Sequence, residues 1–387
     1  MNHTIDVQGS VAPGFEAVAD EFAAVIAEEN GESGAQLAAF VHGQQVIDLW
    51  AGEHVTGDTL TGVLSSTKGA ATLVVALLVQ EGALDIDRPV AAYWPEFSVS
   101  DKADITLRQV LTHQSGLMGA DGGFTFTELA DDRLIARRMA WQRPYFRPGA
   151  AQAYGSFVPF AIVNEAVRRS TGSSIQELYE DRIRAPYALD FYLGLPATEE
   201  QRYLPVLPWL ATPELQAVFE ANSPNPHGLA GISYNLNALA GFAPSDVFEL
   251  PNDPAVRSLG PASMGGVSSA RGLAGLYAAA ISEIDGRAAL LKPDTLGAFA
   301  TVQRAGDDLV RGNRMPYAIG FEAKGLEYPF LSANAFGHAG AAGSDAFADP
   351  RIGLTYGYTR RRAAFGFAGP ENARLAAAVH RAAIQLG

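Results

Sequence analysis

The sequence of 387 residues contains no cysteine, so neither a disulfide framework nor thiolate chemistry is available to the protein. It has no apolar run long enough to span a bilayer, because the stretch LVVALLV is short and is bounded by polar residues. The first residues also lack the basic segment and the apolar segment of a signal peptide. We therefore expect a cytoplasmic protein that has no membrane partner.

Further absences argue against several classes of function. A formal net charge of -14 argues against nucleic acid as a partner, because phosphates require a basic face. The seven histidines show no H-E-x-x-H or comparable metal spacing, and there is no G-x-G-x-x-G or P-loop, so we expect no metal and no other cofactor. The absence of G-x-S-x-G argues against a nucleophile elbow.

The composition and the order of the patterns along the chain predict an α+β protein. With 48% hydrophobic and 18% charged residues, the chain can bury a large core. A helix and a hairpin come first, helices fill the middle, and strands with a closing helix end the chain. The simplest packing is a mostly antiparallel sheet built from both chain ends and flanked by the terminal helices, with an inserted mainly helical domain. We place the sheet domain at residues 1–90 and 260–387 and the helical domain at residues 91–259.

A lysine in an apolar helix is the first candidate for chemistry. The segment that starts at Ser65 predicts a buried helix running to about Gln80. Positions i and i+3 share a helix face, so Ser65 and Lys68 face each other, whereas Ser66 and Thr67 point elsewhere. Burial and the helix dipole disfavour the ammonium form, so Lys68 can be partly neutral near pH 7 and act as a base toward the serine hydroxyl. A Ser-x-x-Lys motif is expected by chance in roughly one sequence of this composition in five. The evidence for a catalytic pair is therefore mainly the apolar helix around Lys68, where a structural lysine is rare.

Two later segments offer partners for this pair. Tyr154 lies after a Pro-Gly turn and just before a helix, a place where a tyrosine taken alone is more often core than catalyst. His338 is followed by small residues, whose backbone can approach a ligand closely, and an amide there could help the amide of Ser65 to hold an oxyanion. A hydrogen-bonded histidine at a strand end is an equally good interpretation of His338.

In their order along most of the chain, these stretches resemble the serine β-lactamase and penicillin-binding-protein superfamily, and within it the family VIII carboxylesterases. The resemblance is carried by the segments GFEAVADEFAAV, SSTKG, ITLRQVLTHQSGL, RPGAAQAYGS and FGHAGAAGSDAFADP. It implies a serine β-lactamase-like fold. It also implies that Ser65 is the acylated nucleophile, that Lys68 is its activating base and that Tyr154 relays protons; which of Lys68 and Tyr154 takes the first proton stays open. The backbone amides of Ser65 and Ala341 would form the oxyanion hole.

Two departures from the family pattern bear on the substrate. Penicillin-recognising enzymes usually carry Lys-Thr-Gly beside the site, whereas this sequence has His338, Ala339 and Gly340. A fixed cation for a β-lactam carboxylate is then missing from that strand, which favours uncharged esters. The tyrosine motif ends in Ser156 instead of asparagine, which removes an amide that would contact an acylamino side chain. We expect His338, Gly340 and Ser156 to lie at the substrate.

The stretch from about residue 200 to 260 is irregular and rich in proline and aromatic residues, which is typical of a functional loop or lid. We expect part of it, including Trp209 and Phe242, to form an apolar acyl or alcohol pocket, although packing is the more common role of any single ring.

The sequence therefore predicts a carboxylesterase that cleaves small, short-chain esters through an acyl-enzyme. Hydrolysis of β-lactams or small amides, or acyl transfer, would use the same residues and stays open. A catalytically silent binding module on the same scaffold is the alternative from another class. The predicted partner is a small ester, and the sequence makes no prediction of the oligomeric state.

Overall fold

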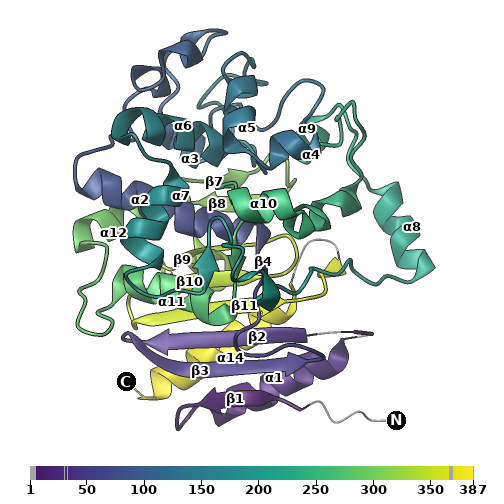
Figure 1. Ribbon diagram of the computed structural model, residues 1–387, viewed down its shortest axis with the longest axis vertical. Helices are drawn as coiled ribbons and strands as arrows, with labels where there is room; N and C mark the ends of the chain where they lie inside the picture. The colour runs from purple at the N-terminus through teal and green to yellow at the C-terminus, as the bar shows by residue number, and fades with distance from the viewer. Residues whose placement is uncertain (1–5, 30, 33, 366–368, 387) are drawn as a thin grey trace.

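Strands from both ends of the chain form one antiparallel sheet of six strands, in the order β1-β3-β2-β11-β10-β9 (Figure 1). The computed structural model describes residues 6–29, 31–32, 34–365 and 369–386. The strands of the sheet are β1 (Gln8–Val11), β2 (Gly34–Val41), β3 (Gln44–Gly52), β9 (Phe336–Ala339), β10 (Asp345–Asp349) and β11 (Leu354–Arg360). The N-terminal hairpin meets the C-terminal strands at the β2–β11 pair, in which Leu37 lies opposite Tyr358. The predicted antiparallel sheet built from both chain ends is confirmed.

The two terminal helices cover one face of this sheet. Helix α1 (Glu16–Glu28) and helix α14 (Glu371–Leu386) pack against each other and against the sheet (Figure 1). Because alternate residues of a strand point to opposite faces, Leu37 joins the core beneath these helices, whereas Ala38 faces the other side. That other side is covered by helix α11 (Ala270–Ile281).

The middle of the chain is mainly helical, as the sequence predicts. Its helices are α3 (Leu107–Leu111), α4 (Phe126–Leu129), α5 (Asp132–Met139), α6 (Pro159–Thr171), α7 (Ile175–Tyr179), α8 (Pro213–Ala221), α9 (Leu229–Ser233) and α10 (Pro254–Leu259). Three of them begin with a capping box, in which Thr106, Thr125 and Ser174 each accept the N–H of the third helical residue. Smaller elements complete the fold: β4 (Thr61–Gly62), β5 (Phe191–Tyr192), β6 (Val267–Ser268), the hairpin β7 (Arg304–Asp307) and β8 (Arg314–Tyr317), α12 (Pro293–Ala300) and α13 (Lys324–Glu327).

Helix α2 (Thr67–Gln80) lies between the sheet and the helical part of the molecule. All of its residues from Thr67 to Leu78 are buried, which is the pattern of a helix in the interior of a large core. It contacts β9 as well as α6, α7 and α12. It ends close to the predicted position, and Gly82 follows with a φ of 74°, a left-handed conformation that glycine adopts without strain. The N-terminus of α2 is therefore held where the two parts of the molecule meet.

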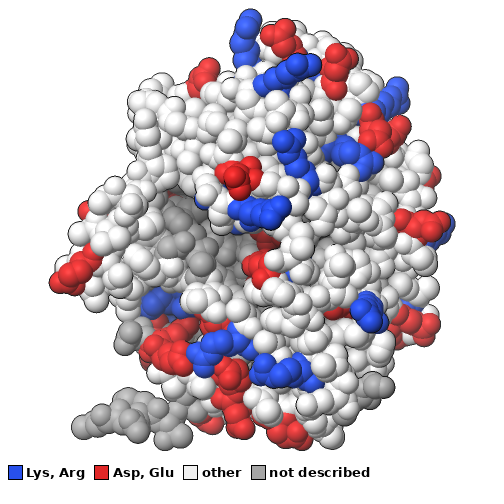
Figure 2. Space-filling view, turned by 180° about the vertical axis from the view of Figure 1, so that it is seen from behind, with Lys and Arg blue, Asp and Glu red and all other residues white. Residues whose placement is uncertain are grey.

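Charged side chains are spread over the surface, and Figure 2 shows acidic and basic groups interspersed on one face. Many of them form ion pairs, such as Arg374 of α14 with Glu21 of α1 at 2.7 Å, an exposed contact that adds little stability. Arg360 at the end of β11 contacts Glu29 just after α1 at 2.7 Å, and both side chains are largely buried. Within the part of the chain that the structure describes, no helix is long and apolar enough to cross a membrane.

Candidate active site

Ser65 lies in a tight turn, η1 (Leu64–Ser66), which leads directly into α2. The preceding residue, Leu64, has a φ of 44°, and a left-handed conformation costs a non-glycine residue about 1–3 kcal/mol. The turn is held from outside, because the Ser344 hydroxyl donates a hydrogen bond of 3.0 Å to the carbonyl of Val63. A strained turn that the surrounding structure holds in place presents the Ser65 side chain in a fixed direction.

The three consecutive hydroxyls at this turn have different partners. The Ser66 hydroxyl lies 3.1 Å from the Ser344 hydroxyl, and the Thr67 hydroxyl donates to the carbonyl of Leu64 and accepts the N–H of Gly266 at 2.8 Å. Only Ser65 among them contacts Lys68, at 3.1 Å from Nζ to Oγ. The prediction that Ser65 faces Lys68, whereas Ser66 and Thr67 point elsewhere, is confirmed.

The Ser65 hydroxyl has contacts with both of its predicted partners. Lys68 Nζ lies 3.1 Å from Ser65 Oγ, and the Tyr154 hydroxyl lies 2.8 Å from the same oxygen. The structure thus brings together Ser65 of the turn η1, Lys68 in the first turn of α2 and a tyrosine that is 89 positions from Ser65 in the chain. A hydroxyl held between an amine and a phenol is the arrangement that general-base activation of a serine requires.

The amine of Lys68 is fully buried and is held by backbone carbonyls. Besides Ser65 Oγ, Nζ donates hydrogen bonds of 2.8 Å to the carbonyl oxygens of Ser156 and Ser263. Burial lowers the pKa of Lys68 to about 7, and the nearby guanidinium of Arg311 acts in the same direction. At neutral pH a substantial fraction of this amine is therefore unprotonated.

Tyr154 is fixed by hydrogen bonds to its main chain. Its carbonyl accepts the hydroxyl of Ser233 at 2.6 Å, and the N–H of Gly155 donates to Nδ1 of His113 at 3.1 Å. The His113 ring also packs on the tyrosine ring, with centroids 4.9 Å apart, and so supports the position of Tyr154. Burial raises the pKa of Tyr154 to about 12, which keeps the phenol protonated at neutral pH.

The amides of Ser65 and Ala341 both belong to residues that line the cavity beside the nucleophile. Within the described parts of the chain, neither N–H donates to a protein acceptor. Gly340 makes a close approach possible, because a Cβ at this position would lie 2.2 Å from the carbonyl oxygen of Val63. The loop after β9 can therefore lie directly against the turn that carries Ser65, and two unused donors are available for an oxyanion.

Ser156 and His338 are both predicted to lie at the substrate, but only one of them lines the cavity. Ser156 lines the cavity, and its hydroxyl lies 3.1 Å from that of Ser233. His338 does not line it: the ring is buried, Nδ1 lies 2.8 Å from the carbonyl oxygen of Ala339, and the ring centroid is 6.5 Å from that of Tyr154. Burial lowers the pKa of His338 to about 4, so the imidazole is neutral at pH 7.

A cavity of about 880 Å³ opens in front of Ser65 and Tyr154. Its apolar wall is formed mainly by the helical part of the molecule and the irregular stretch, with the side chains Leu64, Phe157, Phe219, Leu236, Phe242, Val247 and Met264. Phe242 is in this wall, as the sequence predicts. Trp209 is not; its ring packs against Phe219 and Phe248, with centroids 4.7 and 5.1 Å apart, and so supports the wall from behind.

The structure also places charged residues in the cavity that no sequence motif indicates. Arg311, in the loop between β7 and β8, and Glu322, just after β8, both line it. The expectation of uncharged esters depended on the lack of a cation on the β9 strand, but Arg311 supplies a cation from another segment. It is more than 150 positions from Tyr154 and is one of many arginines, so the sequence contained no signal for it.

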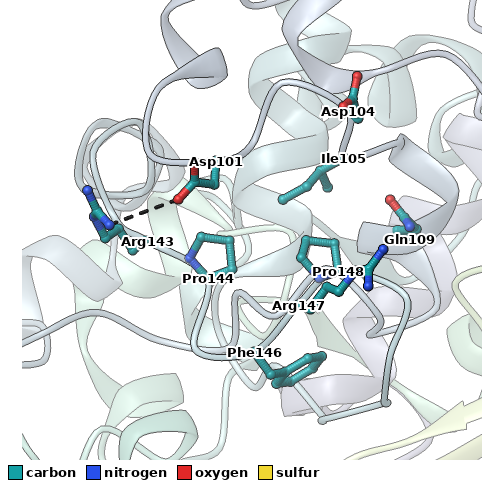
Figure 3. A pocket seen from close by; sticks show the side chains of 9 residues that line it. All are labelled: Asp101, Asp104, Ile105, Gln109, Arg143, Pro144, Phe146, Arg147 and Pro148. Carbon is teal, nitrogen blue, oxygen red and sulfur yellow. Dashed lines mark ion pairs between the residues drawn. The ribbon is translucent and has the colours of Figure 1, made fainter.

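A second cavity, of about 580 Å³, lies apart from these residues (Figure 3). Its lining includes two arginines and two aspartates, of which Arg143 and Asp101 are 3.9 Å apart: Asp101, Asp104, Ile105, Gln109, Arg143, Pro144, Phe146, Arg147 and Pro148. It contains neither Ser65 nor Tyr154. Across the described residues, no group of three or more histidine, aspartate or glutamate side chains is arranged to hold a metal ion.

The comparison with known proteins agrees with this geometry. Residues 16–381 match the Beta-lactamase family. The chain is 27% identical over 373 residues to the esterase/beta-lactamase LipL of Mycobacterium tuberculosis, which covers 92% of this chain and 83% of LipL. Among solved structures, EstA from Arthrobacter nitroguajacolicus Rue61a is 38% identical with a TM-score of 0.89, covering 99% of this chain and 100% of EstA. A family VIII carboxylesterase is 30% identical with a TM-score of 0.83, covering 98% of this chain and 100% of that one.

The protein belongs to the Beta-lactamase family, because the match extends over nearly the whole chain. It is an enzyme, a serine hydrolase of the esterase/β-lactamase type. The resemblance and the fold expected from the sequence are confirmed.

Proposed function

We propose that the protein hydrolyses small carboxylic esters with short acyl chains through an acyl-enzyme on Ser65. The observation that carries this proposal is the pair of contacts on Ser65 Oγ, 3.1 Å to Lys68 Nζ and 2.8 Å to the Tyr154 hydroxyl. The names of the esterase and carboxylesterase relatives support it.

Lys68 is suited to accept the first proton. A neutral amine has two N–H bonds and one lone pair, and the carbonyls of Ser156 and Ser263 provide two acceptors at 2.8 Å. The remaining direction, toward Ser65 Oγ, is then the lone pair. With a pKa of about 7, Lys68 accepts the hydroxyl proton more readily than Tyr154, whose pKa is about 12 and whose phenol is still protonated.

In acylation, Ser65 Oγ forms a bond to the ester carbonyl carbon as its proton moves to Lys68. Negative charge develops on the carbonyl oxygen, where the amides of Ser65 and Ala341 can donate. The bond to the alcohol oxygen then breaks, and the alcohol takes a proton from Tyr154, which recovers one from Lys68. In deacylation, water loses a proton to the same pair and its oxygen bonds to the acyl carbon. The bond to Ser65 Oγ then breaks, Oγ takes the proton back from the pair, and the carboxylic acid leaves.

The test is a set of initial rates on p-nitrophenyl acetate, butyrate and octanoate, beside a chromogenic cephalosporin. We expect rapid ester turnover by the wild type, with the shortest chains preferred, and a loss of at least about a thousandfold in Ser65→Ala. A p-nitrophenol burst equal to the enzyme concentration would show the acyl-enzyme. Turnover that survives in Ser65→Ala would contradict the assignment of the nucleophile.

β-Lactam hydrolysis is the second candidate, because LipL is named both an esterase and a β-lactamase and because Arg311 places a cation in the cavity. The cephalosporin rate decides between the two. Turnover of the cephalosporin that exceeds turnover of every ester would favour this second function.

A further inference from the structure

Arg311 lies directly against the catalytic tyrosine. The carbon at the centre of its guanidinium is 4.6 Å from the centroid of the Tyr154 ring, and the side chain lines the cavity in front of Ser65. A cation over an aromatic face is attracted by the negative charge of that face. The ring that Arg311 contacts carries the hydroxyl that lies 2.8 Å from Ser65 Oγ.

A buried aspartate ties the two segments together. Oδ1 of Asp308 accepts the N–H of Tyr154 at 3.2 Å, that of Val310 at 2.8 Å and that of Arg311 at 2.9 Å. The same carboxylate accepts the hydroxyl of Tyr317 at 3.2 Å. Because one side chain anchors the backbone of both residues, the position of Arg311 over the ring is built into the β7–β8 loop.

Among the residues that the structure describes, the guanidinium makes a long ion pair with a carboxylate and no short one. Within the described residues, its N–H groups make no hydrogen bond to oxygen; one lies 3.8 Å from the sulfur of Met315 and 3.8 Å from Oε1 of Glu322. The other oxygen of Glu322, Oε2, lies 3.0 Å from Lys324 Nζ and accepts the N–H of Ala339 at 2.9 Å, so this carboxylate is shared between Arg311 and Lys324. Arg311 thus lies over the tyrosine ring, and its charge is offset in part by the long ion pair to Glu322.

We propose that Arg311 is a positioning residue of the active site, which holds the Tyr154 ring against Ser65 and stabilises the negative charge that develops on the phenol oxygen during proton transfer. This inference rests on the proposed function of Ser65, Lys68 and Tyr154. It assigns to the β7–β8 loop a part in the chemistry in addition to a place in the cavity wall.

The charges around the site support this role. Burial raises the pKa of Tyr154, and Arg311 opposes that rise. Burial lowers the pKa of Lys68 and Arg311 lowers it further, whereas Glu322 raises it. Both effects of Arg311 favour the forms that catalysis needs, a neutral amine and a phenol that can release its proton.

Lys68 Nζ also lies over the Tyr154 ring, at 5.2 Å from its centroid, but the histidines and tyrosines that face Tyr154 and Arg311 cannot replace the Arg311 cation. Burial lowers the pKa of His113 well below its usual value and that of His338 to about 4, so both are neutral at pH 7. Burial raises the pKa of Tyr317 and of Tyr234, so these neighbours of Arg311 are neutral as well.

The experiment measures the rate at which a small alkyl fluorophosphonate labels Ser65 between pH 5 and 9, by intact mass. In this reaction Ser65 Oγ bonds to phosphorus, the P–F bond breaks, fluoride leaves, and the hydroxyl proton passes to Lys68. The variants are Arg311→Gln and Arg311→Lys. Arg137→Gln is the control for loss of a positive charge, because Arg137 is exposed on α5, outside the cavity. Melting temperatures report folding.

We expect the Arg311→Gln variant to be labelled at least about tenfold more slowly than the wild type at pH 7. The acid limb of its profile of labelling rate against pH should move up by about one pH unit, because both Lys68 and Tyr154 then hold their protons more tightly. Arg311→Lys should restore the position of the limb in part, and Arg137→Gln should match the wild type.

Three outcomes would overturn the inference. One is wild-type labelling in Arg311→Gln. Another is a labelling rate that falls by the same factor at every pH in Arg311→Gln and is not restored in Arg311→Lys, which would indicate a structural role. The third is normal labelling together with a higher KM only for p-nitrophenyl hemisuccinate relative to the butyrate, which would make Arg311 a contact for a substrate carboxylate. The proposed function is judged separately, by ester turnover and its loss in Ser65→Ala.

Discussion

At the scale of single residues, Lys68 determines how activity depends on pH. Its pKa of about 7 and its contact with Ser65 make the unprotonated amine the active form. We expect kcat/KM for p-nitrophenyl butyrate to fall below about pH 7 and to reach a plateau above it. A pH-stat series on the wild-type enzyme measures this limb. An acid limb near the usual lysine pKa, or no limb between pH 5 and 9, would contradict a neutral Lys68.

The same buried lysine makes stability depend on pH. Its pKa is about 7 in the folded protein and 10.5 as the ordinary value, so between these values the unfolded chain binds one more proton than the folded chain. The contribution of Lys68 to the unfolding free energy should then rise with pH by up to about 1.4 kcal/mol per pH unit in this window. Below pH 7 Lys68 is protonated in both states, so its contribution to the slope should vanish.

Lys68→Met removes this titration and leaves the other groups in place. We therefore compare the unfolding free energies of the wild type and of Lys68→Met, measured in urea at pH 7, 8 and 9. The difference between the two should change by about 1 kcal/mol per pH unit. A constant difference across this range would show that the folded lysine keeps its ordinary pKa.

At the scale of elements, the active site depends on how closely the loop after β9 approaches the turn before α2. A methyl group at Gly340 would lie 2.2 Å from the carbonyl oxygen of Val63 and 2.4 Å from the Ser344 hydroxyl. We expect Gly340→Ala to displace this loop, to lower the melting temperature and to reduce esterase kcat by at least about tenfold, because the amide of Ala341 moves.

Gly297→Ala is the matched control for this substitution. Gly297 lies inside α12, and a methyl group there would meet nothing within 4 Å. We expect unchanged activity and a gain of up to about 1 kcal/mol in stability, since alanine is the better helix former. Full activity in Gly340→Ala would contradict the importance of this close approach.

At the scale of the whole molecule, the sheet and the helical part share one core. Side chains of α2, α6, α11 and β9 all belong to a single buried cluster, including Leu73, Phe160, Tyr277 and Phe336. Neither part can lose its packing without exposing this surface. We therefore expect one cooperative unfolding transition, with the same urea midpoint by far-UV circular dichroism and by tryptophan fluorescence. Fluorescence samples both parts, because Trp50 is in β3 and Trp94 is in the helical part. Two separate midpoints would contradict a shared core.

The sequence by itself determined the features that depend on local spacing. Helix α2 could be predicted because consecutive residues encode an apolar helix, and the contact between Ser65 and Lys68 could be predicted because i and i+3 share a helix face. The antiparallel sheet followed from the order of patterns along the chain. Tyr154 was a candidate from its own segment, but its role and that of the Ala341 amide came only from the family resemblance, since no spacing rule joins them to Ser65.

Only the tertiary structure decided which distant side chains meet. It placed Arg311 and the Asp308 anchor at Tyr154, left His338 buried outside the cavity lining, and put Phe242 in the wall with Trp209 behind it. The physical reason is that local conformation depends on a few neighbouring residues, whereas contacts between distant segments depend on how the whole core packs. A single arginine in the β7–β8 loop has no local pattern that marks it, so its role over the tyrosine ring could be recognised only in three dimensions.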